Sequence, residues 1–213
     1  MIDRTYPGPV SALLTTTRRR RPPVARTDGR AGRMDIPVVT AVGHGPTELA
    51  AFDAALVGAG IADRNLIYLS SVLPPGSRVR RPPRLERTPG DWGDRLYCVM
   101  AQSRTSVPGH EVWAGVGWVQ DATGRGLLVE HETHDEAELH GMLDASLAAL
   151  RRNRGDVDLP LRSQAVAGAR CDGTPVCALV VAVFEATGWA TRPTAGRAAG
   201  VVAAAGRAVP AGR

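Results

Sequence analysis

The residue pair best suited to chemistry is Ser70-Ser71, two adjacent serines at the end of an apolar run. The run begins at Asn65, reads Asn-Leu-Ile-Tyr-Leu-Ser-Ser-Val-Leu, and is stopped by Pro-Pro-Gly at 74–76. Residues with hydroxyl side chains are poorly suited to a buried strand, because the hydroxyls need hydrogen-bond partners and gain little from burial. The same pair suits a chain that cleaves itself.

Self-cleavage at this pair follows from ordinary acyl chemistry. Attack of the Ser71 Oγ on the carbonyl carbon of Ser70 shifts the acyl group from nitrogen to oxygen and gives an ester. β-Elimination then breaks the chain and leaves dehydroalanine, which hydrolyses to a pyruvoyl group at the new N-terminus. Cleavage at this bond divides the 213 residues into chains of 70 and 143 residues.

The composition excludes one competing chemistry. All 26 basic residues are arginines, and the chain contains no lysine. Pyridoxal phosphate is held in most amino-acid decarboxylases by a lysine, so this chain cannot hold it in that way. A pyruvoyl carbonyl serves the same purpose, because it condenses with the substrate amine and accepts electrons. Codon preference in a GC-rich genome accounts for the missing lysines, and the exclusion holds whatever the cause.

Asp53 is the first carboxylate of interest. It falls within a helix predicted over 47–59, and its spacing from Leu49 and Leu56 predicts that it shares their apolar face. Burial of an unpaired carboxylate is costly. On the residues alone, either a salt bridge to an arginine of the loop 78–87 or a place in a pocket wall would satisfy it.

Glu130 lies near the end of an apolar strand predicted over 126–132. A carboxylic acid beside apolar groups retains its proton closer to neutral pH, which suits a group that returns a proton after decarboxylation. Glu132, which faces the same way in a regular strand, is the alternative donor.

Asn65 could stabilise the oxyanion formed at the carbonyl of Ser70 during the acyl shift. Asparagine at a strand entrance is, however, commonly a turn residue. In an extended strand Asn65 and Ser71 lie about 20 Å apart. A bent strand or a neighbouring subunit would have to bring them together.

Several short motifs together resemble the pyruvoyl-dependent arginine decarboxylase family. The resemblance covers about residues 36–186, and it rests on motifs that occur in the family's order: Leu49-Ala50-Ala51-Phe52-Asp53-Ala54-Ala55-Leu56, Ala59-Gly60-Ile61, Asn65-Leu66-Ile67, Ser70-Ser71-Val72-Leu73-Pro74-Pro75 and Gly126-Leu127-Leu128-Val129-Glu130.

The resemblance implies a role for each candidate residue. Ser71 becomes the pyruvoyl group, Asn65 assists the self-processing, and Glu130 returns the proton. Asp53, with Leu49 and Leu128 nearby, holds the guanidinium of the substrate. The family's reaction converts L-arginine to agmatine and CO2, in trimers with active sites between subunits. Decarboxylation of another cationic amino acid, and an unprocessed, non-catalytic trimer that binds a cationic metabolite, are the alternatives.

Charge is unevenly distributed along the chain. Residues 1–33 carry a net charge of +6 and residues 187–213 a net charge of +4, whereas the part between them carries −5. We therefore expect one folded domain over 34–186 with basic, disordered tails on both sides, and Met34 is an alternative start. An acidic domain suits a cationic substrate and makes nucleic-acid binding an unfavoured function.

No cofactor other than the pyruvoyl group is expected. Cys98, Cys171 and Cys177 fit no disulfide framework or zinc spacing, and free buried thiols indicate a cytoplasmic protein. His131, His134 and His140 match no metal-ligand pattern, so no metal is expected. No apolar run is long enough to cross a membrane.

The fold predicted from the pattern is an α+β domain in which two antiparallel-rich sheets form a sandwich flanked by helices. A helix should begin at the N-cap Thr47 and stop at Gly60. A second helix should begin at a capping box over 133–136 and bury an apolar stripe formed by Leu139, Leu143, Leu147 and Leu150. The loop 74–90 should remain on the surface. Strands are expected at 36–42, 65–72, 96–101, 111–119 and 126–132, and at 161–170 and 176–184 as a β-hairpin. The second strand of this hairpin is apolar enough to be central in its sheet.

Overall fold

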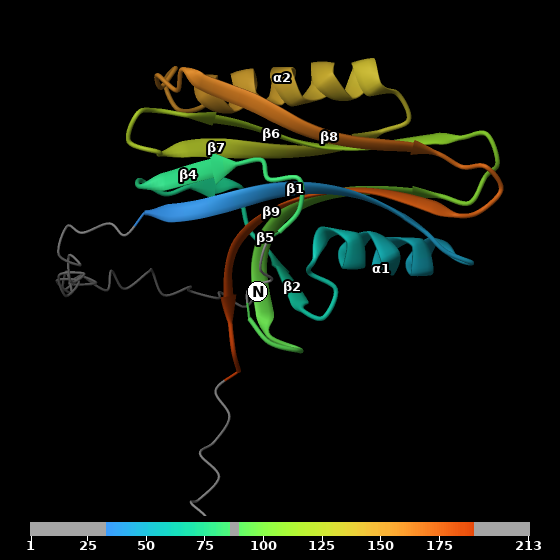
Figure 1. Cartoon of the computed structure of the whole chain (residues 1–213). Helices are drawn as coiled ribbons and strands as arrows, with labels where there is room; N and C mark the ends of the chain where they lie inside the picture. Colours follow the sequence, from blue (N-terminus) through green and yellow to red (C-terminus); the bar gives the residue numbers. More distant parts are fainter. Residues whose placement is uncertain (1–32, 86–89, 190–213) are drawn as a thin grey trace, which may run out of the picture. The chain divides into compact units, whose positions relative to one another are not determined.

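The computed structural model describes residues 33–85 and 90–189, so the tails predicted at 1–33 and 187–213 fall almost wholly outside the described residues. Four layers are stacked in this part of the chain, in the order helix, sheet, sheet, helix (Figure 1). The α+β sandwich flanked by helices is therefore confirmed. The elements are β1 Met34–His44, α1 Glu48–Ala59, β2 Asn65–Tyr68, β3 Val72–Leu73, β4 Ser77–Arg80, β5 Arg95–Thr105, β6 Glu111–Gln120, β7 Gly126–Thr133, α2 Glu136–Arg152, β8 Leu161–Arg170 and β9 Val176–Thr187.

The first sheet has five strands in the order β2-β5-β9-β1-β4. Its central strand β9 is buried continuously over 176–183, because one face meets the second sheet and the other meets α1. β9 pairs antiparallel with β1 and β5, whereas the edge strands β4 and β2 pair parallel with β1 and β5. A strand covered on both faces reads as an unbroken apolar run, as this one does.

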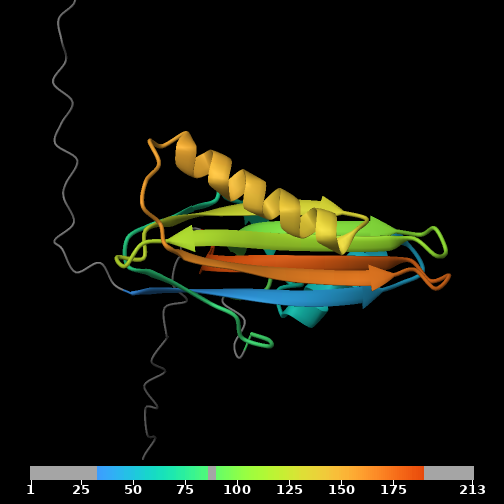
Figure 2. The same cartoon turned by 90° about the horizontal axis from the view of Figure 1, so that it is seen from above.

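The second sheet has four strands in the order β3-β7-β6-β8, and all its pairs are antiparallel. Helix α2 covers its outer face and runs obliquely over the strands (Figure 2). Of the predicted stripe, Leu139, Leu143 and Leu147 are fully buried against this face and Leu150 is partly buried. Gly115 of β6 permits the close approach, since a Cβ there would meet the Leu143 Cδ1 at 3.0 Å.

The helix ends follow from local chemistry. Thr47 is the N-cap of α1, with its Oγ1 accepting a hydrogen bond from the Ala50 amide at 3.1 Å, and Gly60 ends the helix in the left-handed conformation at φ 80°. The capping box predicted over 133–136 is wrong, because it places the N-cap of the second helix at Thr133, two residues too early. Asp135 is the N-cap of α2 and accepts from the Glu138 amide at 2.8 Å. Aspartate and threonine are both good N-caps, so the sequence alone could not separate them.

Two predictions about strands are wrong. β8 and β9 do not form a hairpin, because β8 pairs with β6 in one sheet and β9 pairs with β1 and β5 in the other. The short connection between them carries the chain from one sheet to the next, which leaves β9 free to pair on both sides. The predicted loop 74–90 also contains the short strand β4, which extends the first sheet beside β1.

Candidate active site

The Ser70-Ser71 bond lies where the chain leaves one sheet and enters the other. The strand predicted over 65–72 ends at Tyr68, and the Leu69 amide donates the last hydrogen bond to the first sheet, to the Cys98 carbonyl at 3.0 Å. Immediately afterwards the Ser71 carbonyl accepts from the Leu128 amide of β7 at 2.8 Å. The chain then continues as β3, so the serine pair occupies a crossing between two sheet edges, not the end of a strand.

Ser71 has an unusual backbone conformation. Its φ is 64°, in the left-handed region, and the residue is not glycine. A Cβ in that region crowds the carbonyl group and costs roughly 1–2 kcal/mol. Such strain is characteristic of residues with a functional role, and here it falls on the second residue of the serine pair.

Glu130 is the side chain that the fold places against Ser71. The Ser71 Oγ donates towards Glu130, at 2.9 Å from the Oε2 and 3.1 Å from the Oε1. β3 pairs with β7 only at Gly126 and Leu127, so the edge of β7 is open beyond the crossing. A hydroxyl within reach of a carboxylate is the arrangement that general-base catalysis needs.

Two adjoining cavities surround this pair. One of about 340 Å³ lies between β7 and α2 and is lined by Ser71, Leu128, Val129, Glu130, His131, Ser146, Ala149 and Leu150. The second, of about 240 Å³, lies between β7 and β5 and is lined by Met100, Ala101, Glu130, His131 and Glu132. Glu130 borders both. Leu128 is fully buried between the sheets, which fits its predicted place beside the pocket.

Asp53 and Leu49 lie on the outer face of α1. The expectation that Asp53 shares a buried face with Leu56 is wrong: Leu56 is buried, whereas Asp53 is exposed and Leu49 is 69% exposed. The helix packs instead through small residues, since a Cβ at Gly43 of β1 would lie 2.2 Å from the Ala51 carbonyl oxygen. Leu49, Asp53 and Val57 face solvent on the opposite side of the helix.

Asn65 is not brought to Ser71 within the chain. Its Nδ2 donates to the Gly93 carbonyl oxygen at 2.6 Å, and this bond ties the start of β2 to the turn before β5. The turn role considered from sequence is therefore the one that Asn65 takes within this chain. Its part in self-processing stays a prediction.

The three candidate histidines are separated by the fold. His131 pairs with the Ser146 hydroxyl at 2.7 Å, His134 with the Glu111 carbonyl at 2.8 Å, and His140 with the Gln164 side chain at 2.5 Å. Across residues 33–85 and 90–189, no group of three or more His, Cys, Asp or Glu side chains is arranged to hold a metal ion. No helix in the same residues is long and apolar enough to cross a membrane.

β5 contributes polar residues to a neighbouring cavity, and these residues were not considered from sequence. Gln102 and Arg104 follow an apolar stretch at alternate positions, and they mark the open end of the strand beyond its pairing with β2. Tyr68, which is 61% exposed, has a raised pKa, first because of its partial burial and then because of the charge of Cys98; Arg104 lowers the pKa and Glu132 raises it by a lesser amount. The period-two polar pattern at the end of β5 was the available signal.

Comparison with known proteins gives the class and then the family. The family model described as pyruvoyl-dependent arginine decarboxylase matches residues 35–187, which is almost the whole described domain. The matched class is that of the pyruvoyl-dependent decarboxylases. The chain belongs to the pyruvoyl-dependent arginine decarboxylase family, and the prediction of that family and of its pyruvoyl group is confirmed.

Curated relatives agree with this assignment. The chain is 37% identical over 108 residues to pyruvoyl-dependent arginine decarboxylase 2 of Archaeoglobus fulgidus, covering 48% of this chain and 67% of the relative. It is 35% identical over 100 residues to the pyruvoyl-dependent arginine decarboxylase of Methanothermobacter thermautotrophicus, covering 47% and 62%. It is 38% identical over 104 residues to that of Methanococcoides burtonii, covering 47% and 57%. The chain thus spans roughly three-fifths of the length of these relatives.

Proposed function

We propose that this protein cleaves itself between Ser70 and Ser71, and that the processed protein decarboxylates L-arginine to agmatine and CO2. The observation that carries the proposal is the hydrogen bond from the Ser71 Oγ to Glu130, 2.9 Å from the Oε2, at a strained crossing of the chain. The family match and the names of the relatives support the reaction and the substrate.

Glu130 acts first as the general base of self-processing. It takes the proton from the Ser71 Oγ as that oxygen attacks the carbonyl carbon of Ser70. The Leu128 amide holds the Ser71 carbonyl at 2.8 Å and so fixes the residue during the attack. The oxyanion at the Ser70 carbonyl needs a donor, and an Asn65 supplied by a neighbouring subunit is the candidate, because the chain's own Asn65 is bonded to Gly93.

Glu130 acts again in decarboxylation. A pyruvoyl group formed from Ser71 would supply a carbonyl that condenses with the substrate amine and takes up the electrons released with CO2. The carboxyl group of Glu130 already lies within hydrogen-bond distance of residue 71, so it is placed to return a proton to the Cα of the substrate. Leu128, buried between the sheets, gives that position an apolar wall.

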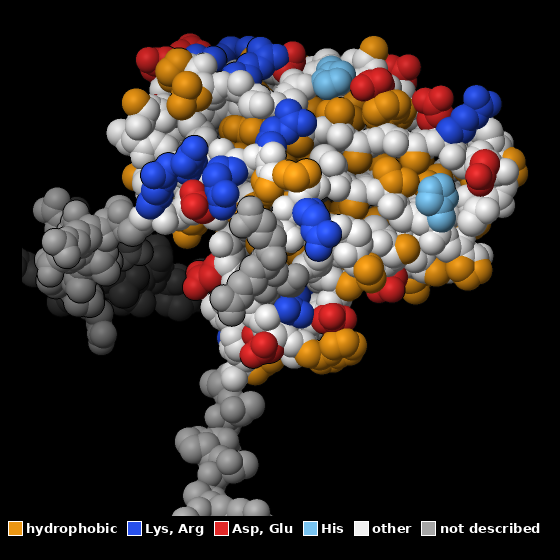
Figure 3. Space-filling view, viewed as in Figure 1, with side chains coloured by type: hydrophobic (Ala, Val, Ile, Leu, Met, Phe, Trp, Pro, Cys, Tyr) orange, Lys and Arg blue, Asp and Glu red, His pale blue; other side chains and the backbone are white. Residues whose placement is uncertain are grey.

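Asp53 binds the guanidinium of the substrate across a subunit boundary. It lies on the exposed face of α1, where Leu49 is 69% and Val57 is 62% exposed. Figure 3 shows hydrophobic and acidic side chains together on the surface over this helix. Exposed aliphatic residues around a carboxylate fit a contact between copies of the chain, and we propose a trimer. A guanidinium offers a carboxylate two parallel hydrogen bonds, which a lysine or ornithine ammonium does not.

Denaturing electrophoresis and mass spectrometry of the purified full chain test the first half of the proposal. The expected result is a fragment that begins with a pyruvoyl-blocked residue 71, and Ser71→Ala should remain a single chain. An intact wild-type chain would refute the proposed enzymatic activity and would favour the alternative, a non-catalytic binding protein.

Release of CO2 from arginine, ornithine, lysine and aspartate tests the substrate. Arginine should be preferred, and Asp53→Ala should cleave normally but lose activity on arginine. Glu138→Gln, which replaces an exposed acid on α2, is the matched control. This variant should retain both self-cleavage and activity on arginine. If lysine or ornithine were decarboxylated faster than arginine, that amino acid would be the substrate in place of arginine.

The three cysteines are free and buried, which supports the proposed cytoplasmic location.

A further inference from the structure

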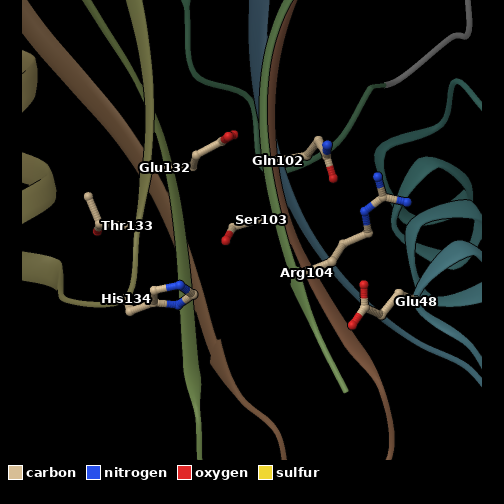
Figure 4. Close-up of a pocket in the computed structure, with 7 residues that line it drawn as sticks. All are labelled: Glu48, Gln102, Ser103, Arg104, Glu132, Thr133 and His134. Atoms are coloured by element: carbon tan, nitrogen blue, oxygen red, sulfur yellow. The ribbon is translucent and has the colours of Figure 1, made fainter. Parts of the chain in front are cut away.

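A group of contacts at the start of β5 connects Asn65 to the segment that follows β9. The polar cavity drawn in Figure 4 lies at the other end of β5, so the two features are separate. Arg95 is the first residue of β5, and it pairs with Asn65 of β2 on one side and with Thr187 of β9 on the other. Trp189 follows the end of β9 by two residues and lies against the same place, with the centroid of its ring 4.7 Å from the Arg95 Cζ.

The carbonyl oxygen of Gly93 accepts hydrogen bonds from both Asn65 and Trp189. The Asn65 Nδ2 lies 2.6 Å from this oxygen, and the Trp189 Nε1 lies 2.9 Å from it. A carbonyl oxygen has two lone pairs, so it can accept from both donors at once. Because a carbonyl group only accepts, the Asn65 side chain presents its amide nitrogen here, and this contact fixes the orientation of the amide.

The second N–H of the Asn65 amide points to a use outside the chain. The amide nitrogen carries two hydrogens, and the bond to Gly93 takes one of them. Asn65 is exposed on the edge strand β2, and within residues 33–85 and 90–189 its side chain makes no second hydrogen bond. The remaining N–H therefore suits the role proposed for Asn65, at the Ser70 carbonyl of a neighbouring chain. A donor stabilises an oxyanion best when it is held in place before the reaction.

Trp189 is itself held by Arg95. The Arg95 Nη2 donates to the Gly188 carbonyl at 2.6 Å, and the guanidinium lies over the Trp189 ring, which adds a cation–π contact. Gly93 has little packing of its own, since its φ is 78° and a Cβ there would meet nothing within 4 Å. Hydrogen bonds, and not packing, therefore hold this part of the turn. The bond from Trp189 is the one that acts on the same oxygen as Asn65.

We infer that Trp189 is a positioning residue for self-cleavage. Through the Gly93 carbonyl it holds the Asn65 amide in the orientation that serves the Ser70-Ser71 bond of a neighbouring chain, and Arg95 acts through Trp189. The inference rests on the proposed function and adds a residue to it. Trp189 lies two residues beyond the segment 35–187 that the family model matches, so the assignment comes from these contacts alone.

The test is Trp189→Phe, with Trp92→Phe as the matched control, a tryptophan that is 83% exposed beside Gly93. Cleavage of freshly synthesised full-length chain is timed on denaturing gels. Trp189→Phe keeps an aromatic ring beside Arg95 but removes the N–H, and it should slow cleavage about 3–10-fold, the effect of one hydrogen bond. Trp92→Phe should cleave at the wild-type rate. Arg95→Lys should also slow cleavage, because an ammonium lacks the planar fork that both contacts Gly188 and stacks on the ring.

Two further measurements separate positioning from a general loss of structure. Asn65→Ala should slow cleavage about 100-fold or more, and adding Trp189→Phe to it should slow cleavage no further, because Trp189 acts through Asn65. A Trp189→Phe chain synthesised together with a large excess of Ser71→Ala chains should cleave at the wild-type rate. The Ser71→Ala chains cannot cleave themselves, but they supply an Asn65 that is held by an intact Trp189.

Equal cleavage rates in Trp189→Phe and the wild type overturn the inference. Additive slowing in the double variant, or slow cleavage that the excess of Ser71→Ala chains does not restore, also overturns it, although a wild type that cleaves and releases CO2 would still support the proposed function. A wild-type chain that stays intact refutes the proposed function and, with it, the inference. Cleavage that depends on Trp189, in a wild type that releases no CO2 from arginine, refutes the decarboxylase and retains the positioning role.

Discussion

Glu130→Gln is the change that best separates the two roles proposed for this carboxylate. The amide oxygen of glutamine can still accept the hydrogen bond that the Ser71 Oγ now makes at 2.9 Å, so the crossing should keep its geometry. What is lost is the ability to take a proton. Removal of a positioned general base slows a reaction roughly 10²–10⁴-fold. That factor corresponds to about 3–5 kcal/mol on the barrier to chain cleavage.

The assay follows disappearance of freshly synthesised full-length chain on denaturing gels over time. Glu130→Gln should extend the half-time for cleavage by at least 100-fold, whereas Glu132→Gln should match the wild type. Circular dichroism should show equal helix and sheet content in all three proteins. A Glu130→Gln chain that cleaves at the wild-type rate would refute the general-base role and leave Glu130 only its part in decarboxylation.

Two further predictions concern a closely packed glycine and the buried cysteine thiols. Gly124→Ala should lower the free energy of unfolding by about 2 kcal/mol more than Gly155→Ala in urea titrations. Both glycines have positive φ, 88° and 73°, but only at Gly124 would a Cβ overlap a neighbour, the Ser77 carbonyl at 2.3 Å, and equal losses would contradict this. Burial raises the pKa of Cys98 and of Cys177 from 9.0 to about 11. The thiols of the unfolded chain therefore ionise at lower pH than those of the folded protein, so the free energy of unfolding should fall as pH rises from about 9 to 11. Rapid reaction of the native protein with Ellman's reagent at pH 8 would contradict the burial of these thiols.

Local sequence signals predicted the elements well. Thr47 and Gly60 mark the ends of α1, and the leucine stripe of α2 faces the sheet as expected. The unbroken apolar run of β9 correctly predicted a central strand. Its partners could not be predicted, because a hairpin and a crossing between stacked sheets have the same short connection.

The candidate site was predictable as a set of residue types but not as an arrangement. Proximity of Ser71 and Glu130 depends on β3 pairing with β7, a contact between strands more than 50 residues apart that no local pattern encodes. The exposure of Asp53 was missed because helical periodicity gives weight to large apolar residues, whereas α1 packs through its alanines. Glycines 43 and 45 opposite them were the only signal that the helix would lie so close.

The crossing at Ser70-Ser71 would also determine how the two product chains are joined. Within the described residues, the part before the bond supplies β1 and β2 to the five-stranded sheet, where β1 lies between β9 and β4, and supplies α1, which packs on the face of that sheet. The proposed cleavage would therefore leave an intertwined heterodimer whose halves share one core, and neither half would retain the complete layer order by itself. Unfolding of the cleaved protein would include dissociation, so its measured Tm should rise with protein concentration and its renaturation should become second order. The uncut precursor, in contrast, would fold in a first-order reaction, because its two halves are held together by the Ser70-Ser71 bond.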